Sequence, residues 1–290
     1  MKIAGFTIIR NAIKFDYPVV EAINSILSIC DKFYVGVGNS EDETRKLIEN
    51  INSDKIIIID TVWDDSLRTG GKILSIETNK IFDVIPAEFD WCFYIQSDEC
   101  VHEDDLPKLK NAMEEFKTNQ NVDGLLFEYK HFYGQYNYIG IGRRWYKHEI
   151  RIIKNNKKIR SHKDAQGFRT IDGKKLRVKN SNAFIYHYGW VKPPKAQQAK
   201  QANFHKMWHN DEWMKSNIPN TEEFDYSNID LLDIYKGTHP KIFQDRIAKA
   251  NWKFVYNKNK VKTSLKYKFL FWVEKYTGLR IGENKNYILK

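Results

Sequence analysis

Short, unbroken apolar runs alternate with periodic segments along the first half of the chain. The runs over residues 2–9, 32–37, 55–60 and 91–95 have the length and composition of strands that are buried on both faces of a sheet. The segment Val19–Leu27, which follows Pro18, shows the spacing of an amphipathic helix. This alternation predicts an α/β fold with a mostly parallel, doubly wound sheet and helices on both faces.

Polar side chains stand at the ends of these four predicted strands. Arg10 and Asn11 follow the first strand, Asn39 follows the second, Asp60 ends the third and Asp98 follows the fourth. The carboxyl ends of parallel strands meet at one edge of a sheet, which is where such folds bind their ligands. We therefore expect these side chains to converge on a single site.

The fourth predicted strand ends in the sequence QSDE at residues 96–99. Two neighbouring carboxylates at the end of a buried strand repel each other, and a divalent cation would stabilise both. The alternative is that Asp98 and Glu99 only cap the helix predicted to begin near Asp104. Neither P-loop nor dinucleotide-binding glycine motifs occur in the sequence.

The second half of the chain continues with predicted strands over 123–132, 150–154 and 183–188, and with a helix after Pro193. The segment Tyr133–Tyr146 is rich in glycine and aromatic residues and is predicted to be a loop. Its rings could stack on a sugar, or they could pack back on the sheet. We expect a catalytic domain over residues 1–192 and a helical C-terminal extension over residues 193–290.

The net charge of +10 is concentrated at the C-terminal end. Residues 241–290 hold thirteen Lys and Arg against three acidic residues, so residues 1–240 carry no net charge. A neutral main body gives no reason to expect nucleic acid as a partner. Residues 251–276 mix lysine with aromatic residues, as in a helix that lies on an anionic membrane surface. Alternatively, this helix packs its rings on the core and leaves its lysines in solvent.

The cysteines and the hydropathy of the chain indicate in which cellular compartment the protein is expected. Cys30, Cys92 and Cys100 form no C-x-x-C pair, and their odd number does not fit a disulfide framework. No apolar run has the length that spans a bilayer, and the first residues lack the pattern of a signal peptide. We expect a cytoplasmic protein, with peripheral attachment to the inner face of the membrane as an option.

The order of these elements, the ending YIQSDE and the segment YHYGWVKPP resemble the glycosyltransferases of the GT-A fold, and among them a bacterial subgroup similar to family 2. The resemblance covers residues 1–190. In that family an Asp-x-Asp motif holds Mn²⁺ or Mg²⁺ against the diphosphate of a nucleotide sugar. Here Gln96 occupies the first Asp position and Asp98 the second. Val37 and Gly38 replace the acidic pair that reads the base, so Asp60 is the candidate for part of that role.

The resemblance implies that Asp98 is a metal ligand and that a histidine on a later strand completes the site. His187 is the candidate, and Glu99 is a further one. Mg²⁺ and Mn²⁺ take oxygen ligands and need only one or two protein carboxylates beside phosphate oxygens. His187 precedes Gly189, where the backbone can approach a ligand closely. The alternative for His187 is a core histidine bonded to a backbone carbonyl.

The donor site is expected to use the strand-end residues and one lysine beside Gly70 and Gly71, although that lysine could equally lie in solvent. The candidate donor-binding residues are Arg10, Asn11, Asn39, Asp60, Lys72, Gln96 and Asp98.

An inverting transferase also needs a carboxylate that accepts the proton of the acceptor hydroxyl. Asp164, in the polar loop SHKDAQGFR, is our candidate, with Glu149 and Asp172 as alternatives. As an ordinary turn residue Asp164 would give the same pattern.

These observations favour a metal-dependent, inverting glycosyltransferase that uses a UDP- or GDP-linked sugar. Its acceptor would be a glycan or a lipid-linked molecule, as in the synthesis of a cell-surface polysaccharide or glycoconjugate. A sugar nucleotidyltransferase is a second hypothesis, but residues 6–14 lack the glycine-rich, arginine-containing loop it requires. The third is a membrane- or glycan-binding protein with a degenerate, inactive site.

Overall fold

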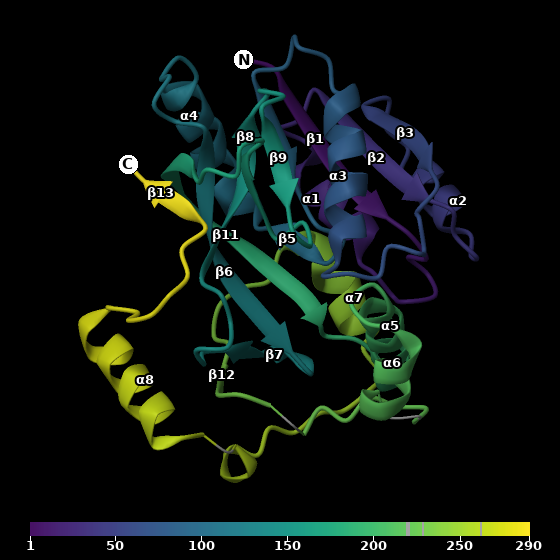
Figure 1. Cartoon of the computed structure of the whole chain (residues 1–290), viewed down its shortest axis with the longest axis vertical. Helices are drawn as coiled ribbons and strands as arrows, with labels where there is room; N and C mark the ends of the chain where they lie inside the picture. Colours follow the sequence, from purple (N-terminus) through teal and green to yellow (C-terminus); the bar gives the residue numbers. More distant parts are fainter. Residues whose placement is uncertain (219–220, 228, 262) are drawn as a thin grey trace.

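The computed structural model describes residues 1–218, 221–227, 229–261 and 263–290, and it shows one large sheet flanked by helices (Figure 1). The strands are β1 Ile3–Ile9, β2 Lys32–Gly38, β3 Ile56–Thr61, β4 Trp91–Tyr94, β5 Glu99–Val101, β6 Gly124–Tyr133, β7 Gln135–Gly140, β8 His148–Lys154, β9 Ile159–His162, β10 Gly167–Thr170, β11 Leu176–Trp190, β12 Leu232–Ile234 and β13 Tyr287–Leu289. The helices are α1 Val19–Leu27, α2 Thr44–Glu49, α3 Lys72–Val84, α4 Leu106–Phe116, α5 Pro194–Lys206, α6 Asp211–Asn217, α7 Gln244–Ala248 and α8 Leu265–Thr277, with 3₁₀ turns η1 Glu103–Asp105, η2 Lys241–Phe243 and η3 Lys258–Lys260.

The sheet is buried on both faces, as the unbroken apolar strands predict. In β1, Ile3 and Ile9 pack on one face with residues of α1, α2 and α4. Ala4, Phe6 and Ile8 point to the other face, where α3 covers them. Successive side chains of a strand alternate between faces, so each strand contributes to both cores. The predicted α/β fold class is confirmed.

The sheet is parallel in its N-terminal half and mixed beyond it. Strands β4, β1, β2 and β3 are neighbours and pair in parallel. The strand β8 lies antiparallel between β4 and β6, and the long strand β11 pairs in parallel with β6. β1, β4 and β11 therefore point the same way. Their carboxyl ends lie at one edge of the sheet, where the polar residues were expected.

The first half of the segment predicted as a loop after Tyr133 is instead a strand, and residues 141–147 are irregular. Gly134 has a left-handed backbone (φ +69°), which permits a tight reversal, and β7 then pairs antiparallel with β6. Most aromatic residues here pack inward. Tyr133 and Tyr136 are buried, and Trp145 packs in the same hydrophobic cluster as Tyr133. The packing alternative thus describes most of these rings.

The C-terminal region contains helices and also two short strands that join the main sheet. β12 pairs with β7 and β13 pairs with β11. Figure 1 shows α8 standing at the periphery, with the chain returning from it to β13. No helix of the described residues is both long enough and apolar enough to cross a bilayer.

Candidate functional site

A pocket of about 410 Å³ opens at the carboxyl ends of β1, β4 and β11, beneath α5. Three elements supply its charged side chains: the strand ends, the turn between β9 and β10, and α5. Aromatic rings form much of the remaining wall. The lining residues used below are Arg10, Tyr17, Trp63, Gln96, Asp98, Tyr146, Asp164, His187, Trp190 and Lys200.

Asp98 points into this pocket and forms an ion pair with Lys200 of α5. The Lys200 Nζ lies 2.9 Å from Asp98 Oδ2, and it donates a second hydrogen bond to the Gly189 carbonyl, also at 2.9 Å. Burial alone would raise the pKa of the Asp98 carboxyl, but the neighbouring Lys200 ammonium outweighs burial and holds that pKa below its usual range. Asp98 is therefore an ionised carboxylate.

Glu99, predicted as a metal ligand, is fully buried and does not line the pocket. Its two oxygens accept hydrogen bonds from Arg151 Nε and Nη2, each at 2.7 Å, from the Tyr129 hydroxyl at 2.7 Å and from the Gln96 backbone N–H at 3.0 Å. Four donors occupy the lone pairs of the carboxylate, so none is left for a cation. The structure places Glu99 in a structural ion pair instead.

His187 lies beside Asp98, with its Nε2 3.8 Å from Asp98 Oδ1. Its Nδ1 lies 3.0 Å from His131 Nδ1, and His131 Nε2 lies 2.8 Å from the Tyr146 carbonyl. A carbonyl only accepts, so His131 donates from Nε2 and accepts at Nδ1. His187 then donates from Nδ1. Its Nε2 therefore carries a lone pair.

Burial explains why both histidines are neutral in this arrangement. It lowers the pKa of His131 well below its ordinary value, and the neighbouring His187 adds to the effect. Burial also lowers the pKa of His187, although the Asp98 charge acts in the opposite direction. The His187 Nε2 lone pair, which faces Asp98 beside the pocket, can thus accept a hydrogen bond or bind a cation.

Asp164 lies at the turn between β9 and β10 and lines the pocket. Both residues beside it have left-handed backbones, with φ of 56° at Lys163 and 60° at Ala165. Non-glycine residues adopt this conformation at an energetic cost, which often marks a functional loop. Gln96 donates from Nε2 to the Ala165 carbonyl at 3.2 Å, and Arg151 donates to the Gln166 carbonyl at 2.7 Å. Gln96 therefore helps to fix the loop that carries Asp164.

Of the other two candidate bases, Glu149 is buried below this loop, where it accepts a hydrogen bond from Gln166 Nε2 at 2.8 Å. Burial raises the pKa of Glu149 to about 8. Asp172 lies on an exposed turn, where it pairs with Lys174 at 2.6 Å. Neither residue lines the pocket.

The remaining predicted donor-binding residues separate into two groups. Arg10 lines the pocket and pairs with Asp65 through its Nη atoms. Asn39 supports it, because its backbone carbonyl accepts a hydrogen bond from Arg10 Nε at 3.1 Å. Asn11 is buried and ties the end of β1 to the turn after β2 through Glu41 N–H at 2.7 Å.

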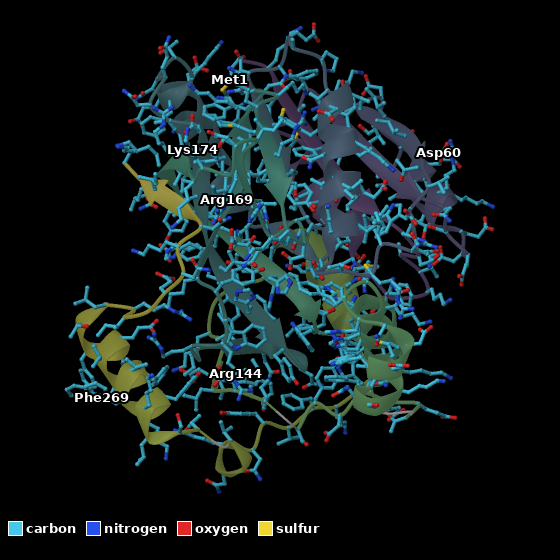
Figure 2. The ribbon with its side chains drawn as sticks, viewed as in Figure 1. Met1, Asp60, Arg144, Arg169, Lys174 and Phe269 are labelled. Carbon is cyan, nitrogen blue, oxygen red and sulfur yellow. The ribbon has the colours of Figure 1, made fainter. Side chains whose placement is uncertain are left out.

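Asp60 and Lys72 do not reach the pocket. β3 is the edge strand, and Asp60 extends into solvent there, with its side chain 65% exposed and paired with Arg45 (Figure 2). Lys72 is exposed at the start of α3. The expected convergence of strand-end residues therefore holds for Arg10 and Asp98 and is wrong for Asp60.

Lys200 and Arg151 are site residues that the sequence did not indicate. Lys200 lies 102 residues from Asp98 along the chain, within a helix that has several similar polar residues. Arg151 looks like one charge in a strand of alternating charge. The signal that could have revealed it is its place between Ile150 and Ile152 in a strand in the middle of the sheet, where a charge needs a buried partner.

The expected Mn²⁺ or Mg²⁺ site is not assembled by these side chains. Of the three predicted ligands, Glu99 is fully engaged by Arg151. Asp98 and His187 do face each other, but the Lys200 ammonium already forms an ion pair with Asp98 through Oδ2. A dication on Oδ1 would lie next to that positive charge. Of the predicted ligands, Asp98 Oδ1 and His187 Nε2 therefore remain, beside the Lys200 ammonium.

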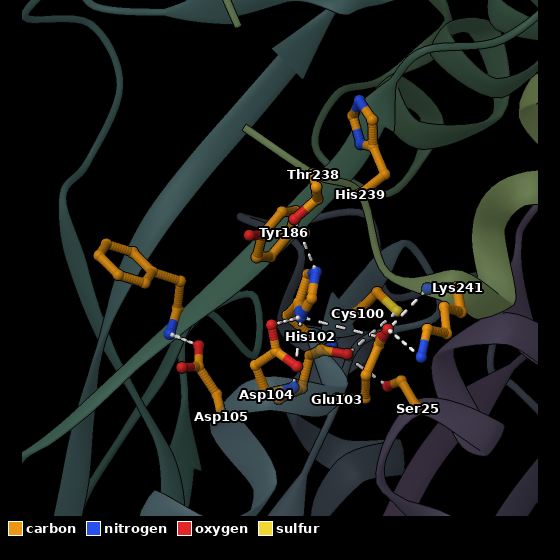
Figure 3. A network of polar contacts seen from close by, with 12 residues as sticks. Ser25, Cys100, His102, Glu103, Asp104, Asp105, Tyr186, Thr238, His239 and Lys241 are labelled. Atoms are coloured by element: carbon orange, nitrogen blue, oxygen red, sulfur yellow. Dashed lines mark hydrogen bonds and ion pairs between the residues drawn. The ribbon is translucent and has the colours of Figure 1, made fainter. Parts of the chain in front are cut away.

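A second group of potential metal ligands lies on the far side of β11. His102, Glu103 and Asp104 are the only such group found among residues whose placement is described. Figure 3 shows the contacts that His102 and Glu103 already make with neighbouring residues. His102 contacts the Thr238 hydroxyl at 3.1 Å and the Asp104 N–H at 3.2 Å, and Glu103 accepts from the Lys241 N–H at 3.1 Å. These contacts fasten the segment around residues 238–241 to the start of α4.

No protein-family model and no curated protein match the chain, whereas solved structures do. TarS 1–349 of S. aureus in complex with UDP is 21% identical over 47% of this chain and 37% of that one, with a TM-score of 0.34. Glucosyl-3-phosphoglycerate synthase of Mycobacterium tuberculosis, in complex with Mn²⁺, UDP and phosphoglyceric acid, is 17% identical over 46% and 43%, with a TM-score of 0.29. The 4-diphosphocytidyl-2C-methyl-D-erythritol synthase of Anaerococcus prevotii is 8% identical over 53% and 70%, with a TM-score of 0.34.

The chain thus spans less than half the length of the first two of these proteins. The similarity concerns the α/β fold, and the names of the two synthases describe different products. Function therefore has to be inferred from the pocket itself.

Proposed function

We propose that this protein is a glycosyltransferase of the GT-A type that uses a nucleotide diphosphate sugar as donor. The observation that carries the proposal is the arrangement of Asp98, Lys200 and Asp164 around one pocket at the carboxyl ends of parallel strands. Transfer from a diphosphate requires positive charge where the leaving group develops its charge, and a base where the acceptor is deprotonated. The pocket offers both. Its volume lies within the range of small-ligand sites.

Asp164 is the proposed base. It is a carboxylate held at the pocket wall by a loop that Gln96 and Arg151 fix from below. A base on the wall opposite the leaving group would give inversion at the anomeric carbon. Trp63, Tyr146 and Trp190 also line the pocket, and such rings stack on bases and on sugar rings.

The helix α8 supports an acceptor at a membrane surface. Four of its apolar residues form one exposed stripe, and lysines flank the stripe. A lipid-linked acceptor would be reached from such a surface. The Mn²⁺ or Mg²⁺ expected from the sequence stays a prediction that nucleotide-binding measurements with and without metal would test.

A donor panel tests the proposed function. The protein is incubated with UDP- and GDP-sugars, and release of the nucleoside diphosphate is measured. Wild-type protein is expected to release it from at least one donor, and Asp164→Asn is expected to lower the rate by about 10²–10⁴-fold. Thermal stabilisation by the nucleotide should be unchanged in this variant, because the substitution removes a base and not a phosphate contact. Asp60→Asn, which changes an exposed carboxylate outside the pocket, is the control.

The other two hypotheses give different results in the same assay. A nucleotidyltransferase would release pyrophosphate from a nucleoside triphosphate and a sugar phosphate. A binding protein would release nothing from any donor. Either result would overturn the proposed transferase.

A further inference from the structure

The ion pair between Lys200 and Asp98 lies inside the pocket rather than on the molecular surface. Asp98 is 8% exposed and Lys200 is 9% exposed, and both contribute to the pocket wall. Burying an unpaired charge costs several kcal/mol, so such a pair forms only where each charge meets its partner. The ammonium of Lys200 is thus a fixed positive charge at the end of β4.

Lys200 is held in a defined position. Its Nζ donates to Asp98 Oδ2 and to the Gly189 carbonyl, and lies 5.0 Å from the centre of the Tyr17 ring. Gly189 is required for this arrangement, because a Cβ there would come within 2.7 Å of both Asp98 Oδ2 and His187 Nε2. An ammonium has three N–H donors. Over the described part of the chain, its hydrogen bonds account for two of them.

A second cationic side chain lines the same pocket. Arg10 contributes its guanidinium, which also pairs with Asp65. A nucleoside diphosphate brings two or three negative charges, and these need cations beside them.

We propose that Lys200, positioned by Asp98 and the Gly189 carbonyl, binds the diphosphate of the donor in place of a divalent cation. This inference rests on the proposed function. In the transfer, the bond between the anomeric carbon and the terminal phosphate oxygen breaks, and its electron pair stays on that oxygen. The acceptor oxygen forms the new bond and gives its proton to Asp164. Lys200 stabilises the charge on the departing diphosphate, and Asp98 is a positioning residue.

Two consequences separate this arrangement from a metal site. Donor binding should not require Mn²⁺ or Mg²⁺, because the ammonium is part of the chain. It should also depend on the side chain at position 200, which a metal site built from Asp98 and His187 would not require.

The experiment measures UDP and GDP binding by thermal shift and calorimetry, in EDTA and then in Mn²⁺ or Mg²⁺. Wild-type protein is expected to bind one nucleotide equally well in EDTA. Lys200→Met should raise the Kd about tenfold or more, because it removes a charge-assisted contact to phosphate. Lys200→Arg should restore part of the affinity. Lys195→Met, which removes an exposed lysine of the same helix, is the matched control.

A second variant covers the case in which Lys200→Met fails to fold because Asp98 is left unpaired. Asp98→Asn combined with Lys200→Met removes both charges and should fold. It should bind the nucleotide as weakly as is expected of Lys200→Met. Nucleotide binding that appears only with metal would overturn this inference and leave the transferase proposal intact. Binding in EDTA that is the same in Lys200→Met and Lys195→Met would also overturn it. No binding under any condition would overturn the proposed function and this inference with it.

Discussion

Residues 96–99 form one turn, and their side chains make contacts on different sides of it. Asp98 and Gln96 both line the pocket, and Gln96 also donates to the loop that carries Asp164. Glu99 points into the interior and binds Arg151, which in turn donates to the Gln166 carbonyl of that loop. The turn closes on itself, because Glu99 N–H donates to the Gln96 carbonyl and the Glu99 carboxylate accepts from Gln96 N–H, both at 3.0 Å. The same few residues therefore position both Asp98 and the proposed base Asp164.

Replacing Arg151 tests the buried half of this arrangement. Arg151 and Glu99 are both 0% exposed, so Arg151→Met would leave an unpaired carboxylate in the interior. We expect the free energy of unfolding to fall by about 3–5 kcal/mol in urea denaturation. Adding Glu99→Gln should recover part of the loss. Lys174→Met, at an exposed ion pair, should leave stability unchanged, and an Arg151→Met protein as stable as wild type would contradict the assignment.

Glu149 predicts a pH dependence of stability. Burial raises its pKa to about 8 in the folded protein, against 4.5 for the ordinary side chain. Between these pH values the folded state holds a proton that the unfolded state has lost, so this group makes stability fall as pH rises from about 5 to 8. In Glu149→Gln that contribution disappears. Urea denaturation across this range should show a shallower decline than wild type, by up to about 1.4 kcal/mol per pH unit; parallel curves would contradict the prediction.

The sequence predicted the first four strands, the edge of the sheet where the pocket lies, and the placement of Asp98, His187 and Asp164 at that edge. It did so because buried strands and their polar ends are local patterns. The partners of these residues could not be predicted in the same way. Lys200 approaches Asp98 from a helix 102 positions away, and only the three-dimensional packing of α5 over the sheet brings them together. Glu99 failed as a ligand for the same reason, because its partner Arg151 lies on another strand.

At the scale of elements, α8 is unusual because its polar face points toward the protein. Glu274 is buried on that face and pairs with Arg143 at 2.5 Å and with Arg280 at 3.4 Å, while the Tyr267 hydroxyl bonds Asp230 at 2.6 Å. Positions 267 and 274 are two turns apart on this inner side. The four apolar residues of the opposite face are directed away from the body of the molecule.

The outer face of α8 carries an apolar stripe with lysines at its borders. Leu265, Phe269, Trp272 and Tyr276 are 85%, 61%, 57% and 68% exposed, and Figure 2 shows Phe269 on the side away from the sheet. Their spacing of four, three and four places them on one helical face. The lysines at 266, 268 and 275 are also exposed. We infer an anionic lipid surface as the occupant, because apolar insertion and headgroup attraction would act together there.

Vesicle sedimentation tests this surface. Phe269→Ser combined with Trp272→Ser should weaken binding to phosphatidylserine-containing vesicles by at least about tenfold, since each ring buried in lipid contributes about 1.5–3 kcal/mol. Raising the salt concentration should weaken wild-type binding, because the lysine contribution is screened. Ile171→Ser, which removes an apolar side chain exposed elsewhere to 71%, is the control. Equal binding to neutral vesicles, or no binding to either kind, would exclude an anionic lipid surface.

At the scale of the whole molecule, the C-terminal region completes both the core and the pocket. Phe243 is 0% exposed and stacks on Tyr188 of β11, with ring centres 4.0 Å apart. Tyr226 donates from its hydroxyl to the Lys192 carbonyl at 2.9 Å. Lys200 belongs to the same region. Residues beyond position 192 are thus packed into the fold that the first 192 residues begin.

The fragment of residues 1–192 is therefore expected not to behave as an independent domain. It would lack Lys200 and would expose Tyr188 and Tyr133, which the C-terminal residues cover in the full chain. Loss of this burial should abolish a cooperative thermal transition, or lower its midpoint well below that of the full chain, and should abolish nucleotide binding. Circular dichroism melts and UDP or GDP titrations of both proteins measure this. A fragment that melts cooperatively at the temperature of the full chain would show that the C-terminal region is an appended unit, and that the pocket can form without α5.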